Sequence, residues 1–278
     1  MRFDAYAGNV SGATAEEVSA MTSWAIKGRV ERHKPRGRYH DCFEVFDGTA
    51  PVGWVGHDPQ LDTAYFEFKG PLTPQTSGAI RKHWPDSHNV SRVDSCEDWD
   101  DKAAFERVST LIDQSVDPRV KSRIIAPRCG QDTGRTIYWG SPKSSVLCRL
   151  YEAGKMEDRT HFGTPDWVRA EVQLRPPKAE LKKLMSRLTP LDAWGFSAWS
   201  TRAAARIAEV DVNRFVLDSA PPDFERTTLY LARAYKRHFA EMLADHGDWL
   251  CLGREIEAVW AADDEAKQAF ECQQNRNN

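Results

Sequence analysis

The stretch RTIYWGSPKSSVLCRLYEAGK (residues 135–155) predicts the β-hairpin on which the expected fold is built. A Gly-Ser-Pro-Lys-Ser-Ser turn (140–145) separates two runs of strand-forming residues, and so short a connection makes the two strands antiparallel. Along the second run apolar and polar side chains alternate, so the two faces of the strand must differ in polarity. The apolar face carries Val146, Cys148 and Leu150, and the opposite face carries Arg149 and Tyr151.

The segment that follows, DWVRAEVQLR (166–175), shows the same alternation over its full length. On burial, each of its larger apolar side chains contributes about 1.5–3 kcal/mol, which fixes one face of this strand against a core. A shift of one residue would bury Glu171, so the register is well specified. The polar face then carries Arg169, Glu171 and Gln173.

Patterns of the same kind run along the chain and predict an α+β fold. Strand-like runs occupy 39–48, 63–70, 89–99, 135–140, 145–154 and 166–175. Helical spacing of apolar residues occurs at 14–28, 100–114, 178–188, 197–210, 227–247 and 254–270. We therefore expect a largely antiparallel sheet covered by helices on one face, followed by a helical C-terminal part.

Two prolines, Pro176 and Pro177, predict a boundary, because proline disfavours the continuation of a strand. The expected domains are a catalytic sheet domain (1–177) and a helical C-terminal region (178–278). The second region either stands apart or packs with the first as one unit.

Composition excludes several classes of protein. No run approaches the roughly 18 apolar residues of a membrane span, and the N-terminal segment has no apolar signal-peptide core, so we expect a cytoplasmic protein. The six cysteines form no CxxC pair, which argues against a zinc site and for free thiols. The net charge of −3 argues against non-specific coating of nucleic acid, although basic runs at 27–38 and 175–187 are candidates for phosphate contact.

Strand parity gathers acids, arginines and a tyrosine on one face of the predicted sheet. If the strands are neighbours, that face displays Glu67, Arg92, Asp94, Arg149, Tyr151, Arg169 and Glu171. One interpretation is the solvated face of a half-exposed antiparallel sheet. The other is a site in which carboxylates hold a divalent cation and guanidiniums hold phosphate, because the acids lie near the middles of strands with an arginine two residues away. In that site the Tyr151 hydroxyl is a candidate nucleophile, once a metal-polarised phosphate or an arginine activates it.

The sequence lacks the motifs of the commoner phosphate and hydrolase sites. It contains no GxxxxGK[ST], no GxGxxG and no GxSxG. The eight histidines form no HxH pair, so any metal here rests on carboxylates.

Three segments, in this order and spacing, resemble the replication initiation factor family: SRVDSCEDWDD (91–101), GRTIYWGSPKSSVLCRLYEAGK (134–155) and WVRAEVQLR (167–175). That family includes initiators of staphylococcal rolling-circle plasmids, filamentous-phage replication proteins and related conjugative relaxases. Its pattern is an R-[IV]-D-x-x-x-D segment, a T-x-Y-x-G-S-x-x-S hairpin leading into R-x-Y-[ED]-K-G, and a W-x-R-x-E strand. The resemblance covers roughly residues 60 to 245.

The resemblance implies a rolling-circle DNA replication initiator in the cytoplasm of a bacterial host cell. Such a protein is an origin-specific, metal-dependent endonuclease that cuts one strand with a tyrosine, becomes linked to the 5′ phosphate and leaves a 3′-OH for a polymerase. It also rejoins DNA ends by strand transfer. The implied cofactor is Mg²⁺ or Mn²⁺. The implied partners are single- or double-stranded origin DNA, host helicase and polymerase, and a second copy of the chain.

The resemblance also assigns roles by residue. The nucleophile is Tyr151, with Arg149 and Arg169 beside it. The metal-binding carboxylates are, in order of preference, Asp94, Glu171, Asp98 and Glu67. The expected DNA contacts come from Arg92 and Lys143, from the basic run with Lys27, Arg29, Arg32, Lys34, Arg36 and Arg38, and from Arg175, Lys178, Lys182 and Lys183.

Ala153 stands where the family usually has lysine, which removes one phosphate contact and keeps two other functions open. They are a non-catalytic origin- or operator-binding regulator with the same fold, and a metal-dependent phosphodiesterase with water as the nucleophile. Tyr138 and Tyr65 are the fallback nucleophiles. Trp194 and Trp199 are candidates for base stacking or, by preference, for the core.

Overall fold

The computed structural model describes residues 1–127, 133–155, 164–209, 236–251, 253–254 and 257–258. The chain forms two compact units, Met1–Val216 and Leu217–Asn278. The second unit contains helix α7 (Lys236–His246), which lies within the helix predicted at 227–247. The helix predicted at 254–270 falls almost wholly outside the described residues.

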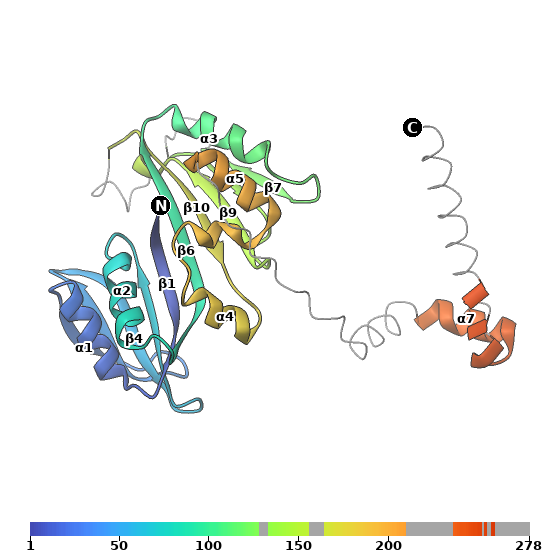
Figure 1. The fold of residues 1–278 in the computed structure, drawn as a ribbon, viewed down its shortest axis with the longest axis horizontal. Helices are drawn as coiled ribbons and strands as arrows, with labels where there is room; N and C mark the ends of the chain where they lie inside the picture. Colours follow the sequence, from blue (N-terminus) through green and yellow to red (C-terminus); the bar gives the residue numbers. More distant parts are fainter. Residues whose placement is uncertain (128–132, 156–163, 210–235, 252, 255–256, 259–278) are drawn as a thin grey trace. The chain divides into compact units, whose positions relative to one another are not determined.

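One antiparallel sheet organises the first unit (Figure 1). Its strand order is β2-β3-β4-β5-β1-β6-β10-β9-β8-β7, and every neighbouring pair is antiparallel. The strands are β1 (Arg2–Ser11), β2 (Arg29–His33), β3 (His40–Asp47), β4 (Ala50–Asp58), β5 (Thr63–Lys69), β6 (His88–Asp100), β7 (Ser122–Ile125), β8 (Thr136–Trp139), β9 (Val146–Tyr151) and β10 (Trp167–Leu174). The predicted α+β class with a largely antiparallel sheet is confirmed.

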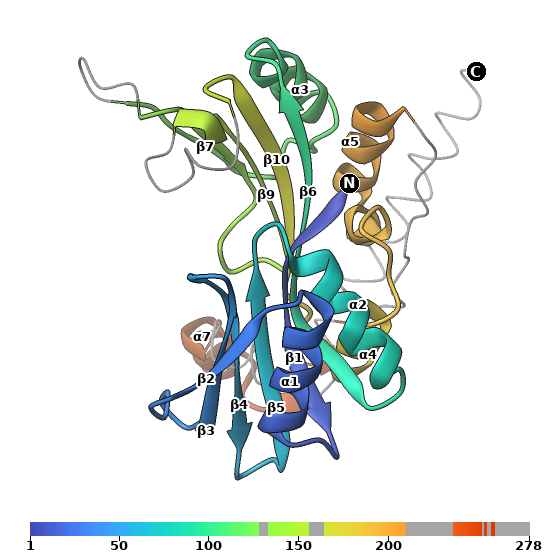
Figure 2. The same cartoon turned by 90° about the vertical axis from the view of Figure 1, so that its left-hand side faces the viewer.

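Helices α1, α2, α4 and α5 cover one face of this sheet, as Figure 2 shows. The helical elements of the unit are α1 (Ala15–Ala25), α2 (Thr73–His83), α3 (Ala104–Asp113), α4 (Ala179–Met185), α5 (Ala198–Ala208) and the short 3₁₀ turns η1 (Ala153–Lys155) and η2 (Asp192–Phe196). Between sheet and helices lies a continuous apolar core. The predicted strand parity holds, because the apolar core contains the alternate side chains Ala64, Phe66 and Phe68 of β5 and Val168, Ala170, Val172 and Leu174 of β10.

Strand β1, which occupies the middle of the sheet, was not predicted from the sequence. It pairs with β5 on one side and with β6 on the other. Its sequence RFDAYAGNVS holds small and charged residues, and a bulge between Phe3 and Ala5 interrupts the alternation. A bulge adds one residue to one strand and re-aims a side chain, so here two consecutive residues, Asp4 and Ala5, serve the same face.

Helix α2 also escaped prediction, because its sequence TPQTSGAIRKH is a poor helix former. Pro74 lies in its first turn and Gly78 in its middle. The hydroxyl groups of Thr76 and Ser77 donate to main-chain carbonyls one turn back, which competes with helix formation in an isolated peptide. Packing of Ile80 into the core therefore determines whether this helix forms.

The elements α4, η2 and α5, which follow the two prolines, belong to the first unit. Ser95 Oγ donates to the carbonyl of Pro190 at 2.7 Å, and Trp194 Nε1 donates to Ser95 Oγ at 3.3 Å. Arg81 of α2 donates to the carbonyl of Leu188 at 2.6 Å. Trp194 is fully buried and Trp199 is nearly so, which makes both part of the core. The boundary predicted after residue 177 thus lies inside a compact unit that continues to Val216.

This packing predicts that residues 178–209 are needed for the sheet to fold. A chain that ends at residue 177 would expose the apolar surface under Trp194 and leave Arg81 without its carbonyl partners. We expect it to lose cooperative thermal unfolding, whereas a chain that ends at Val216 keeps one sharp transition. Circular dichroism melts of the two chains make the comparison. A sharp transition in the shorter chain would show that the sheet is a domain by itself.

Candidate active site

Three neighbouring strands bring predicted site residues to one face of the sheet. β9 pairs with β10, and β10 pairs with β6. Residues directly opposite one another in antiparallel strands project from the same face. The opposed pairs here are Arg149 with Glu171, Tyr151 with Arg169, Gln173 with Asp94, and Arg169 with Asp98. The polar face that strand parity predicted is therefore present.

This part of the face is buried. Asp94 and Glu171 are each 1% exposed, and Arg169 is 2% exposed. The interpretation as a solvated sheet face is wrong here. Charged groups so far from water require partners, and the partners identify the chemistry of the site.

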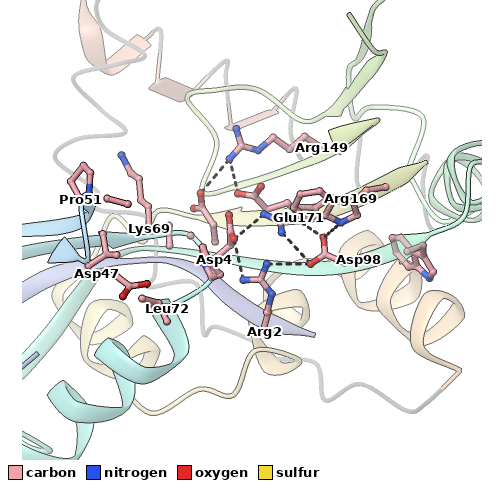
Figure 3. Close-up of a pocket in the computed structure, with 18 of the residues that line it drawn as sticks. Arg2, Asp4, Asp47, Pro51, Lys69, Leu72, Asp98, Arg149, Arg169 and Glu171 are labelled. Atoms are coloured by element: carbon pink, nitrogen blue, oxygen red, sulfur yellow. Dashed lines mark hydrogen bonds and ion pairs between the residues drawn. The ribbon is translucent and has the colours of Figure 1, made fainter. Parts of the chain in front are cut away.

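Arg149 joins two buried carboxylates (Figure 3). Its Nη2 donates to Glu171 Oε1 at 2.6 Å and to Asp94 Oδ2 at 3.3 Å. Asp94 also accepts from Arg92 Nε at 2.9 Å and from the Gln173 amide at 3.2 Å. Arg149 Nε is buried and finds no hydrogen-bond partner among the described residues. One charged donor beside the carboxylates thus lacks a described partner, and a rearrangement that exposes it would allow it to bind an anionic ligand.

The two carboxylates titrate differently. Burial, together with the charge of Asp94, raises the pKa of Glu171 to about 7, against the opposing effect of Arg149. The pKa of Asp94 is lowered: burial acts to raise it, but hydrogen bonds from Arg92 and Glu171 outweigh burial. Below neutral pH Glu171 is therefore protonated while Asp94 is ionised, and the pair carries a single negative charge.

Tyr151 ends β9 directly beside this pair. Its Oη donates to Glu171 Oε2 at 3.2 Å. The side chain is 3% exposed, so Oη cannot meet a phosphate without a rearrangement that uncovers it. The tyrosine predicted as the nucleophile thus has a carboxylate as proton acceptor, but it lies behind the surface.

A second ion cluster flanks the first and holds Arg169. Arg169 Nε donates to Asp98 Oδ1 at 2.6 Å, and Nη1 lies 2.8 Å from Asp4 Oδ1. Arg2 contacts both acids, each at 3.2 Å (Figure 3). Trp167 donates to Asp98 at 2.9 Å. Arg169 is therefore fully engaged by protein, which suits a positioning role beside Tyr151 better than contact with phosphate.

A cavity of about 750 Å³ opens beside both clusters. Charged side chains from the sheet line it together with apolar and small residues of the β3–β4 and β5–α2 connections. The lining includes Arg2, Asp4, Pro51, Lys69, Leu72, Arg92, Asp94, Asp98, Trp99, Arg149, Trp167, Arg169 and Glu171. Tyr151 is not among the lining residues, which agrees with its burial.

Asp94 and Glu171 form a donor set that suits a hard divalent cation. Mg²⁺ takes oxygen ligands and is commonly held by one or two carboxylates, with water and substrate phosphate completing its coordination. Arg149 already contacts both carboxylates, so a metal ion bound by them would have to displace this guanidinium or share the carboxylates with it. Within the described part of the chain no group of three or more His, Cys, Asp or Glu side chains is placed to hold a metal. A metal here would therefore rest on this pair.

The other two predicted metal ligands lie elsewhere. Asp98 belongs to the Arg169 cluster. Glu67 accepts from Trp54 Nε1 at 3.3 Å and pairs with Lys69 at 2.6 Å. The structure does not bring either carboxylate to Asp94 and Glu171.

The basic run 27–38 forms the edge strand β2 and the turn into β3. Lys27 and Lys34 are exposed. The four arginines each pair with an acid of the same region: Arg29 with Glu31 at 2.9 Å, Arg32 with Asp41 at 2.7 Å, Arg36 with Glu44 at 3.0 Å and Arg38 with Asp58 at 3.0 Å. These ion pairs offset much of the positive charge that the sequence indicated.

The remaining predicted DNA contacts are spread over the unit. Arg175 and Lys178 are exposed after β10, and Lys182 and Lys183 are half-buried on α4. Lys143 is exposed in the β8–β9 turn, at the opposite end of β9 from Tyr151.

The surroundings of residue 153, close to Tyr151 in the chain, explain why alanine fits this position. Ala153 is fully buried in η1, where a lysine side chain would have no access to water. Lys155 ends the same turn, and its Nζ lies 3.4 Å from Glu152 Oε1. Of the fallback nucleophiles, Tyr138 lies opposite Arg149 on the same face, and Tyr65 has a pKa raised by burial.

The titration of Glu171 predicts a pH-dependent stability. The folded state raises the pKa of Glu171 from 4.5 to about 7. The contribution of this residue to the free energy of unfolding is therefore complete below about pH 4.5 and is lost as pH rises through about 7. We expect the Tm of the wild-type protein in chelator to fall between about pH 5 and pH 8. Glu171→Gln keeps a neutral side chain of the same shape, so its Tm should fall less over that range. Equal slopes in the two proteins would contradict the assignment.

Among the described residues, no helix has both the length and the apolar character needed to cross a membrane.

Comparison with known proteins supports the fold. No protein-family model and no curated protein matches the chain. Among solved structures, the chain is similar to a rolling circle replication initiator protein from Geobacillus stearothermophilus, with a TM-score of 0.50 and a sequence identity of 17%. The similarity covers 81% of this chain and 89% of that chain. At this identity it concerns the fold alone, and the chain has the fold of a rolling-circle replication initiator structure, as the sequence resemblance implied.

Proposed function

We propose that this protein is a rolling-circle DNA replication initiator. Its activity is metal-dependent, origin-specific cutting of one DNA strand, followed by strand transfer through a 5′-phosphotyrosine intermediate. The observation that carries the proposal is the hydrogen bond from Tyr151 Oη to Glu171, within a cluster of two carboxylates and one arginine beside a cavity. The fold that the chain shares with a replication initiator supports the same conclusion.

In the proposed cutting step, Tyr151 Oη attacks the phosphorus of a DNA phosphodiester. A bond forms between Oη and phosphorus, and the bond from phosphorus to the 3′ oxygen breaks. Above about pH 7, where Glu171 is ionised, the phenol proton passes to its Oε2, which already accepts the hydrogen bond from Oη, and the leaving 3′ oxygen takes a proton from water to become 3′-OH. Attack of a 3′-OH on the phosphotyrosine reverses these steps and joins DNA ends.

Arg149 and Arg92 would stabilise the negative charge that grows on the phosphate. Arg149 brings a buried Nε with no described partner, and both arginines line the cavity. Charged donors held in place before the reaction lower its barrier, because they need no reorganisation when charge develops. Arg169, held by Asp4 and Asp98, would orient the end of β9.

Asp94 and Glu171 would hold the divalent ion. When bound, Mg²⁺ or Mn²⁺ supplies Lewis-acid polarisation of the phosphate oxygens and makes the phosphorus more electrophilic.

The burial of Tyr151 favours a second candidate function, a metal-dependent phosphodiesterase that uses water. The cavity reaches Asp94, Glu171 and Arg149 but not Tyr151. A water molecule in that cavity would need no rearrangement of β9 to reach a phosphate. The two functions differ in their products, because only the tyrosine mechanism leaves protein attached to the 5′ end.

Substitution of the nucleophile separates the two. We expect Tyr151→Phe to keep the fold, since the ring remains, and to lower nicking of supercoiled plasmid carrying the cognate origin by about 10³-fold or more. The covalent protein–DNA adduct should disappear on denaturing gels. Tyr138→Phe, on the same sheet face, is the matched control and should retain the adduct. Full nicking by Tyr151→Phe with no adduct would instead establish the water mechanism.

Metal binding can be tested without activity. After treatment with chelator, added Mn²⁺ should raise the Tm of the wild-type protein near pH 8, because a ligand that binds only the folded state stabilises it. Asp94→Asn should abolish the increase. Asp86→Asn removes an exposed carboxylate outside the cavity and should leave the increase unchanged. The same increase in Asp94→Asn as in wild type would remove Asp94 from the site.

A further inference from the structure

Three aromatic side chains form a cluster on the polar face of the sheet, away from the candidate active site. We call Tyr39, Trp54 and Tyr65 the aromatic platform. The Tyr39 and Tyr65 rings stack with centroids 4.8 Å apart, and the Trp54 ring lies 5.1 Å from that of Tyr65 and 5.4 Å from that of Tyr39. All three side chains are partly exposed. Tyr65 was considered above as a fallback nucleophile, and none of the three residues was predicted to contact DNA bases.

The core does not need these rings. The opposite face of β3, β4 and β5 carries the buried side chains Val45, Val55 and Phe66, and helices α1 and α2 pack there. On the platform face, β4 has Gly56, where an added Cβ would come within 2.9 Å of Tyr39 Cβ and 3.1 Å of the Trp54 ring. The glycine allows the rings to lie close to the backbone. The described helices of the first unit that contact β3, β4 and β5 lie on the opposite face, and the three rings form a compact aromatic cluster on this one.

Two arginines extend the platform. The guanidinium carbon of Arg36 lies 5.0 Å from the centroid of the Trp54 ring, and that of Arg38 lies 5.2 Å from the centroid of the Tyr39 ring. The side chain of Arg38 is 55% exposed, so one plane of its guanidinium faces solvent. Aromatic rings and guanidinium planes are the two surfaces on which unpaired bases stack.

The platform is connected to the cavity of the candidate active site. Arg92 lies opposite Ala7 and Tyr65 lies opposite Asn9 on the two sides of β1, so the two side chains project from the same face of the sheet. Arg92 also donates to Asp94 and lines the cavity. Glu67 accepts a hydrogen bond from Trp54 of the platform and pairs with Lys69, which also lines the cavity. Between β6 and β5 lies β1 alone, so Arg92 and Tyr65 are roughly 10 Å apart across the sheet.

We infer that the aromatic platform binds unpaired bases of single-stranded DNA a few nucleotides from the phosphate in the cavity. The identity of the nucleic acid rests on the proposed function, because a strand cut at the cavity must continue over the neighbouring sheet surface. Acids balance the arginines here, since Glu44 pairs with Arg36 and Asp58 with Arg38. Stacking is therefore the main source of affinity at the platform, and phosphate attraction is the smaller one.

The test is binding of a labelled oligothymidylate of roughly 12 nucleotides, followed by fluorescence anisotropy in the full chain with Tyr151→Phe, which cannot form the adduct. Adding Trp54→Ala or Tyr65→Ala should weaken binding by about 5-fold or more for each ring, as expected for loss of one stacked base. Trp54→Phe and Tyr65→Phe keep an aromatic face and should retain most of the affinity. Trp24→Ala, which removes a 77% exposed tryptophan from helix α1, is the matched control and should have no effect.

Native-like Tm values with unchanged oligothymidylate binding in both alanine variants would overturn the inference. Equal losses for a blunt duplex and for the single strand would overturn it too, because stacked duplex bases cannot reach the platform. Tighter binding of oligouridylate than of oligothymidylate would replace DNA by RNA as the ligand and refute the assignment. The outcome is separable from that of the proposed function: loss of the adduct depends on Tyr151, whereas oligonucleotide binding is measured without cutting.

Discussion

The contact of the Arg149 guanidinium with two buried carboxylates constrains the rest of the first unit. Glu171 and Asp94 are almost completely shielded from water, and a buried charge without a partner costs several kcal/mol. The three residues come from β9, β10 and β6, so their charges are matched in one register of the three strands only. A shift of the register by one residue would place these charges in the apolar core without partners. It would also move the apolar side chains of the same strands to the polar face. The contacts that create a chemical site thus also align the sheet. They leave Tyr151 beside a proton acceptor and Arg169 beside Asp98.

Much of this arrangement was predictable, because alternation is a property of the sequence itself. The strands at 63–70, 89–99, 145–154 and 166–175 follow period-two patterns, and their buried and polar faces were assigned correctly. Helix α1 was also predictable, since its Thr14–Glu17 capping box adds a local start signal to helical spacing. Strand β1 was not, because Asp4 and the adjacent bulge break its alternation and its partners are distant in sequence. Helix α2 was not, because its stability comes from tertiary packing rather than from the helix propensity of TPQTSGAIRKH.

Some features of the candidate site could likewise be predicted from local sequence patterns, and others could not. Arg149, Tyr151, Glu171 and Asp94 could be grouped from strand parity and the family resemblance. The pairing partners of Arg169 and Asp98 could not be predicted, because Asp4 contacts Arg169, and Arg2 contacts Asp98, through β1, a strand that no local pattern indicates. Burial was also beyond the sequence, since a polar strand face looks the same whether water or an ion network satisfies it. The aromatic platform needed the fold as well, because Tyr39, Trp54 and Tyr65 come from separate segments that meet only when β3, β4 and β5 pair.

The central place of β1 has a consequence for synthesis. This strand is made before the other described strands of the sheet, both of its neighbours, β5 and β6, are made later, and Asp4 contacts Arg169 only after β10 has emerged. Pairings between segments so far apart in sequence form slowly and late in folding. A nascent chain that ends before β5 therefore contains β1 unpaired, and its charged side chains lack partners. The candidate site therefore assembles late in synthesis, and a translation product that ends before β10 lacks it.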